Sequence, residues 1–70
     1  MEKVKFGERL NELRLSKGLS RANLAEKLGV SVRLISYWEN AERECDFGML
    51  IKIADIFCVS TDYLLGRTDY

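Results

Sequence analysis

The chain has 70 residues and a formal net charge of zero, with 47% apolar and 31% charged residues, and it contains no proline and no histidine. A chain of this length forms one domain, and none of its apolar runs approaches the roughly 20 residues that a membrane span requires. The N-terminal residues, MEKVKFGERL, lack the apolar core of a signal peptide, so we expect a cytoplasmic protein with no membrane attachment.

The composition argues against catalysis and against metal or cofactor binding. Without histidine the chain lacks the commonest general base, and no Ser or Cys has an activating partner nearby in sequence. No glycine-rich phosphate loop follows a strand, and the four ligands of a structural zinc are missing. We therefore expect no enzyme, no cofactor, no metal and no small-molecule ligand. Cys45 and Cys58 are expected to be reduced, with Cys58 buried; a regulatory thiol pair is the alternative.

Two helices are expected before residue 30. The first repeats apolar residues at the i, i+4, i+7 spacing of a helix of about 12 residues: Phe6, Leu10 and Leu13. Gly18 can end it in a left-handed conformation. Ser20 is a good N-cap for the second helix, and Gly29 stops it. The inner face of that helix carries Leu24, Ala25 and Leu28.

Residues 31–40, SVRLISYWEN, predict a third helix with two different faces. Only Gly29 and Val30 separate it from the second helix, so the two form an angled corner, and Ser31 can cap its start. At about 100° per residue, one sector is apolar: Leu34, Ile35 and Trp38. The opposite side carries Val32, Arg33, Ser36, Tyr37 and Asn40. It offers what major-groove reading needs, a guanidinium, a methyl surface, hydroxyls and an amide. The alternative is an ordinary amphipathic helix.

Two further helices complete the chain. Asp46 can cap a fourth helix, which carries four apolar residues: Leu50, Ile51, Ala54 and Phe57. Ser60 can cap a short fifth helix, TDYLLG, that Gly66 ends. No segment has the pattern of a strand. The sequence therefore predicts an all-α fold of five helices in a single domain over residues 1–70, with an ordered core of about residues 6–66.

Charge is unevenly distributed along the chain. Residues 1–40 hold eight Lys or Arg and five acids, which gives +3, whereas residues 41–70 hold three and six, which gives −3. The molecule therefore has a basic half, which contains the predicted corner, and an acidic half. Chance placement on a neutral surface is the alternative explanation.

Three stretches together resemble the helix-turn-helix of the Cro and lambdoid-repressor family: LSRANLAEKLGVSVRLISYWENAERE, RLNELRLSKGLS before it and LIKIADIFCVSTDYLLG after it. The resemblance runs from about Phe6 to Gly66. It implies a compact five-helix, repressor-like domain in which helices 2 and 3 form the helix-turn-helix of a small phage or mobile-element-like regulator. It implies a repressor that binds double-stranded DNA at a palindromic operator through helix 3, as a homodimer at least on DNA. It also implies a bacterial or phage-encoded protein that is nucleoid-associated when bound.

The resemblance implies roles for individual residues. The base-contacting positions are Arg21, Val32, Arg33, Ser36 and Tyr37. The phosphate-contacting positions are Arg14, Lys17, Ser20, Ser31, Asn40 and Arg43. Arg14 and Glu39 match a structural ion pair that ties helix 1 to helix 3 beside the DNA backbone. Physical chemistry supports part of this set, because the free N–H groups at the start of helix 2 form a natural phosphate site with Ser20.

Two positions depart from the family pattern. Arg21 stands where Gln is most common, so it either reads guanine or grips phosphate. The loop NAERECD, residues 40–46, is unusually acidic, and Arg43 is its only cation. Because phosphate contacts supply most non-specific affinity, this loop predicts weaker non-specific DNA binding than is typical.

The sequence leaves an alternative open for the function and another for the dimer surface. A protein-interaction module on the same fold, antitoxin-like or a co-regulator, is the alternative function, supported by the zero net charge and the acidic loop. A purely structural bundle leaves the corner unexplained. A dimer would use the fifth helix and its flank: Val59, Tyr63, Leu64 and Tyr70. The alternative is that these residues, Leu64 above all, complete the core of the monomer.

Overall fold

The computed structural model describes residues 3–69, and every regular element in this range is a helix. The helices are α1 (Lys3–Ser16), α2 (Arg21–Leu28), α3 (Val32–Glu39), α4 (Phe47–Phe57) and α5 (Thr61–Leu64). The predicted all-α fold of five helices is confirmed. None of the helices in residues 3–69 combines the length and the apolarity that crossing a membrane requires.

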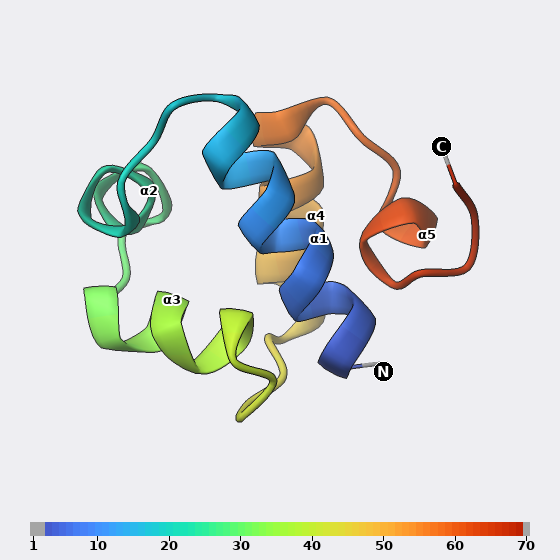
Figure 1. Ribbon diagram of the computed structural model, residues 1–70, viewed down its shortest axis with the longest axis horizontal. Helices are drawn as coiled ribbons and strands as arrows, with labels where there is room; N and C mark the ends of the chain where they lie inside the picture. Colours follow the sequence, from blue (N-terminus) through green and yellow to red (C-terminus); the bar gives the residue numbers. More distant parts are fainter. Residues whose placement is uncertain (1–2, 70) are drawn as a thin grey trace.

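The helix α1 is the centre of the arrangement. In Figure 1, α1 crosses the middle of the molecule, with α2 and α3 on one side, α5 on the other and α4 passing behind it. α1 packs against α3 and α5, whereas α2 packs against α3 and α4. The α2–α3 pair is therefore held from two directions, which fixes its outer surface as a unit.

Four helices begin where the sequence predicts N-caps. Each capping side chain accepts a hydrogen bond from the backbone N–H three residues on, with 2.7–3.1 Å between nitrogen and oxygen: Ser20, Ser31, Asp46 and Ser60. The first of these caps is reinforced, because the Ser20 N–H donates in return to Asn23 Oδ1 at 3.1 Å. Local sequence is enough to place these helix starts.

Left-handed residues end several helices. Gly18 (φ 68°) follows α1 and Gly29 (φ 71°) ends α2, as predicted, because glycine adopts positive φ without strain. Ala41 (φ 59°) after α3 and Cys58 (φ 56°) after α4 take the same conformation with a side chain. For a residue with a Cβ this conformation costs about 1 kcal/mol, so the end of α3 is mildly strained.

A single apolar core joins the helices. Its most deeply buried large side chains are Phe6, Leu10, Leu24, Leu28, Ile35, Ile53 and Leu64. The Trp38 ring of α3 packs edge-on against Phe6 of α1, with 6.4 Å between ring centroids. Gly7 permits this close approach, since a Cβ there would lie 2.5 Å from the Trp38 carbonyl oxygen and 2.8 Å from that of Glu39. The C-terminal end of α3 is therefore clamped against α1.

The apolar residues expected on α4 do not all face the core. Ile51 is 55% exposed, whereas Ile53 is buried together with Leu50 and Ala54. Both residues fit a helical apolar spacing with Leu50 and Ala54, so spacing alone cannot choose between them. The orientation of α4 against α2 and α5 makes the choice.

The prediction that Cys58 is buried is also wrong. Cys58 is exposed, where its left-handed backbone turns the chain away from α4, whereas Cys45 is buried. The two thiols flank an 11-residue helix, which separates them by roughly 16 Å, too far for a disulfide. Burial, followed by the carboxylates of Asp46 and Glu44, raises the pKa of Cys45 to about 11. That thiol is protonated at neutral pH and a poor nucleophile.

The predicted dimer surface on α5 is partly used inside the monomer. Leu64 is fully buried in the core, so the alternative that it completes the monomer is correct. The Arg9 guanidinium carbon lies 4.0 Å from the centre of the Tyr63 ring and covers part of it. Val59 packs, half-buried, against the core, and Tyr70 lies outside the described residues.

Candidate nucleic-acid interface

The corner between α2 and α3 is built from backbone hydrogen bonds. The Gly29 N–H donates to Glu26 and the Val30 N–H to Ala25 O at 3.0 Å, which closes α2. The chain then extends through Ser31, whose hydroxyl oxygen accepts the Leu34 N–H at 3.1 Å and starts α3. With so short a connection, α3 has a fixed direction relative to α2.

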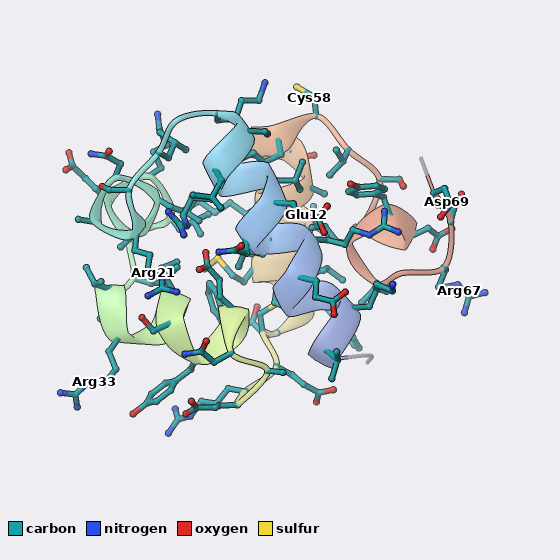
Figure 2. The ribbon with its side chains drawn as sticks, in the orientation of Figure 1. Glu12, Arg21, Arg33, Cys58, Arg67 and Asp69 are labelled. Atoms are coloured by element: carbon teal, nitrogen blue, oxygen red, sulfur yellow. The ribbon has the colours of Figure 1, made fainter. Side chains whose placement is uncertain are left out.

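The outer side of α3 is accessible along its whole length. Val32 is 45% exposed, Arg33 is exposed, and Ser36 and Tyr37 are half-buried. Figure 2 shows Arg33 extending away from the body of the molecule. On the inner side Ile35 is fully buried beside Trp38. The four α3 residues predicted to contact bases therefore retain accessible surface on one docked helix.

The carboxylate of Glu39, at the end of α3, accepts hydrogen bonds from both preceding helices. Arg14 Nε lies 2.7 Å from its Oε2, and Arg14 Nη2 lies 3.3 Å from Oε1. Asn11 Nδ2 and Arg21 Nε also donate to Oε1, at 3.1 and 3.0 Å. The Glu39 side chain is only 1% exposed. We call Glu39 with Asn11, Arg14 and Arg21 the Glu39 cluster.

The charges in the Glu39 cluster oppose the effect of burial on the carboxylate. Burial is the largest single influence and acts to raise the pKa of Glu39. Hydrogen bonds from Arg14, Asn11 and Arg21, together with the positive charge of Arg14, outweigh it, so the pKa of Glu39 is lowered from its ordinary 4.5. Glu39 is thus ionised at neutral pH. Two guanidiniums around one carboxylate leave a net positive charge beside α3.

Arg14 has a largely structural position. It is 8% exposed, and its Nη1 donates to the Leu19 carbonyl oxygen at 2.9 Å in addition to the two bonds to Glu39. It thereby links α1, the α1–α2 loop and α3. The proposed contact of Arg14 with phosphate stays a prediction, and this geometry favours a role in which Arg14 supports the interface from behind.

Arg21 was expected to contact a base, and the structure adds a partner that sequence reasoning missed. Figure 2 shows its side chain between α2 and α3, directed toward α3. One edge of its guanidinium is held by Glu39, while the side chain remains 41% exposed. Asn11 was also missed, although it lies one helical turn before Arg14 on the same face of α1, which is a recognisable signal.

The remaining predicted phosphate contacts are accessible to solvent. Lys17, Ser20, Ser31 and Asn40 are all exposed. The two serine hydroxyl oxygens are used as N-caps, which places each of them at a helix start with its N–H groups. Arg43 is placed differently, because its guanidinium carbon lies 4.8 Å from the centre of the Tyr37 ring.

Comparison with known proteins gives consistent results. A helix-turn-helix family model matches residues 10–64. The chain is 36% identical over 66 residues to the HTH-type transcriptional regulator ImmR of Bacillus subtilis, covering 94% of this chain and 52% of that protein. It is 41% identical over 63 residues to YonR, an SPbeta prophage-derived regulator of the same species, covering 90% and 58%. The chain thus spans about half the length of the curated relatives it matches.

A solved structure is similar over almost its whole length. The restriction-modification controller protein C.AhdI from Aeromonas hydrophila superposes with a TM-score of 0.77 at 34% sequence identity. The superposition covers 87% of this chain and 92% of the controller protein. The five-helix arrangement is therefore shared with a protein whose described role is control of a restriction-modification system.

Proposed function

This chain belongs to the helix-turn-helix family of DNA-binding transcriptional regulators, and we propose that it is a repressor that binds a palindromic operator as a homodimer through α3. The observation that carries the proposal is the accessible outer side of α3, which shows Val32 and Arg33 to solvent while Trp38 and the Glu39 cluster fix the helix from behind. Bound at a promoter, such a dimer would exclude the polymerase. No effector or cofactor is needed for this mechanism.

Base reading is assigned to residues of α3 and to the start of α2. Arg33 can donate two hydrogen bonds to guanine O6 and N7, and the Val32 methyl groups can contact a thymine methyl. Ser36 and Tyr37 add hydroxyl groups on the same side. Arg21, whose guanidinium is oriented by Glu39, would read an outer guanine with its exposed edge.

Backbone contacts are assigned to residues around the reading surface. The N-terminus of α2 presents unpaired N–H groups beside Ser20, and Lys17 adds a cation nearby. Ser31 at the start of α3 and Asn40 at its end would contact phosphates on either side of the groove. Such contacts set the position of α3 but carry no sequence information.

A dimer contact is proposed on α4 rather than α5. Phe47 is 80% exposed and Ile51 55% exposed, and they lie four residues apart on one face of α4. The chain measures 28 × 23 × 20 Å, so two copies whose recognition helices lie about 34 Å apart can meet directly. Burying these side chains against a second copy would supply the apolar contact that α5 lacks.

Selection from a random pool of duplex DNA tests the proposal. The protein is incubated with the pool at near-physiological salt, and the retained sequences are read. An enriched inverted repeat is expected, together with an affinity that falls steeply with salt because bound counterions are released. If no sequence enriches even at low salt, the proposal fails. The protein-interaction module then becomes the better hypothesis, with the outer side of α3 as its contact surface.

A further inference from the structure

The loop that follows α3 folds back on the helix. The Ala41 N–H donates to the Trp38 carbonyl oxygen at 3.2 Å, and the Glu42 N–H donates to that of Tyr37 at 2.8 Å. These bonds and the left-handed Ala41 reverse the chain within two residues. The next residue, Arg43, therefore returns alongside the last turn of α3.

Arg43 lies over the aromatic ring of Tyr37, a residue of the reading surface. Its guanidinium carbon lies 4.8 Å from the centre of the Tyr37 ring, well inside the range of a cation–π contact. An aromatic ring covers the face of a guanidinium and leaves the N–H donors, which lie in its plane, available at the edge. Tyr37 follows Arg33 by one helical turn, so the two arginines flank the same stretch of α3 from opposite ends.

We propose that Arg43, oriented by Tyr37, is a base-reading residue that recognises a guanine in the major groove at an operator position separate from that read by Arg33. This assignment rests on the proposed function and replaces the expectation that Arg43 grips phosphate. A guanidinium held in a fixed orientation suits the two acceptors of guanine, O6 and N7. A phosphate contact can be made by a point charge such as a lysine ammonium, whereas the paired acceptors of guanine require the planar pair of donors that arginine has.

The surroundings of Arg43 favour this assignment. Arg43 is the only basic residue in residues 40–46. Glu42 precedes it directly, and Glu44 and Asp46 follow it. A loop with three carboxylates and one cation is repelled by the phosphate backbone as a whole. The contact with Tyr37 turns the Arg43 guanidinium toward α3. The loop would therefore place one hydrogen-bond donor group in the groove while attracting the phosphate backbone only weakly.

The test compares four forms of the full chain by selection from the same random duplex pool, followed by titration on the selected site. Arg43→Lys keeps the charge and loses the planar pair of donors, whereas Arg43→Ala loses both. We expect Arg43→Lys to lose the preference for guanine at one position per half-site and to bind the preferred site roughly 5- to 150-fold more weakly. Arg67→Lys, at an arginine of the C-terminal segment, is the matched control and should leave the preference unchanged.

A phosphate contact would give a different pattern, and it would overturn the assignment. Arg43→Lys would then bind every sequence nearly as well as the parent, and Arg43→Ala would weaken all sequences alike while reducing the salt slope by about 1. Failure of the proposed function itself is distinguishable, because the unmodified chain would then enrich no sequence.

Substitution of Tyr37 tests the orienting contact. Tyr37→Phe keeps the ring and should retain the guanine preference that depends on Arg43. Tyr37→Leu removes the ring and should reduce that preference several-fold. Equal guanine preference in the Phe and Leu variants would contradict the orienting role of Tyr37.

Discussion

The two ends of α3 are held in opposite ways. At the C-terminal end Trp38 lies in the core, and the carboxylate of Glu39 accepts hydrogen bonds from α1 and α2. At the N-terminal end Val32 and Arg33 are exposed on the outer side, while the Ser31 cap and the buried Ile35 hold the helix from the inner side. Because both ends belong to one eight-residue helix, anchoring one end determines where the side chains of the other end stand. Anchoring and reading are thus divided along the helix.

The largest effect is expected from removing the anchor. Glu39→Ala leaves Arg14, a nearly buried guanidinium, without its charge partner, so we expect the free energy of unfolding to fall by about 3–5 kcal/mol. Urea unfolding followed by circular dichroism measures it. Glu42→Ala, at an exposed acid just beyond α3, is the control and should change stability by less than about 0.5 kcal/mol. Similar losses in both variants would mean that Glu39 does not anchor α3.

The Glu39 carboxylate should also make the stability of the anchored end depend on pH. The pKa of Glu39 is lower in the folded chain than its ordinary 4.5, so its contribution to stability is complete above pH 4.5. That contribution is lost as the pH falls through the lower, folded-state value. The urea midpoint of the parent chain should therefore decrease more steeply below pH 4.5 than that of Glu39→Gln, which has no carboxyl group to protonate.

The next largest loss of stability is expected where α1 packs closely against the C-terminal end of α3. Gly7→Ala places a methyl group against the Trp38 and Glu39 carbonyl oxygens, so α1 must move, at a cost of about 1–3 kcal/mol. Gly48→Ala is the control, because its new Cβ makes only an ordinary contact of 3.5 Å with Asp46 Oδ1. That variant should gain up to about 1 kcal/mol in helix propensity. Destabilisation of both variants to the same extent would contradict the steric argument.

Much of the fold was predictable because its signals are local. The caps at Ser20, Ser31 and Asp46 each act within three residues, and Gly29 ends its helix by its own conformation. The exposure of Val32 and Arg33 was equally predictable, since the helical period alone separates Arg33 from the buried Ile35.

The anchored half was only partly predictable, because its contacts join distant parts of the chain. The bond from Asn11 to Glu39 spans 28 residues, and that from Arg21 to Glu39 spans 18. A helical period describes one helix at a time, so it places Asn11 on the same face of α1 as Arg14 but does not predict which residue of α3 either side chain meets. The contact of Arg43 with the Tyr37 ring depends on the reversal at Ala41, which requires a positive φ that is uncommon for alanine and has no local signal in the sequence.

A third effect should appear at the reading end and leave the fold intact. Arg33→Ala is expected to weaken binding to the selected operator by about 1–3 kcal/mol and to relax the preference at one base position. Its urea midpoint should equal that of the parent, because the side chain is exposed. Fluorescence anisotropy with the operator and its single-base variants measures both quantities. Unchanged affinity and unchanged base preference would show that the outer side of α3 is not the reading surface.

The smallest effect tests whether the anchored end carries strain. Ala41 holds φ at 59°, where a Cβ is unfavourable, so Ala41→Gly should raise the free energy of unfolding by up to about 1 kcal/mol. Ala22→Gly, at an exposed site within α2, should instead lower it by about 0.5–1 kcal/mol. Opposite signs in these two variants would show that the anchor keeps α3 in place despite a strained exit. A loss of stability in both would mean that Ala41 is not strained. The turn after α3 would then cost no conformational energy for the Glu39 cluster to offset.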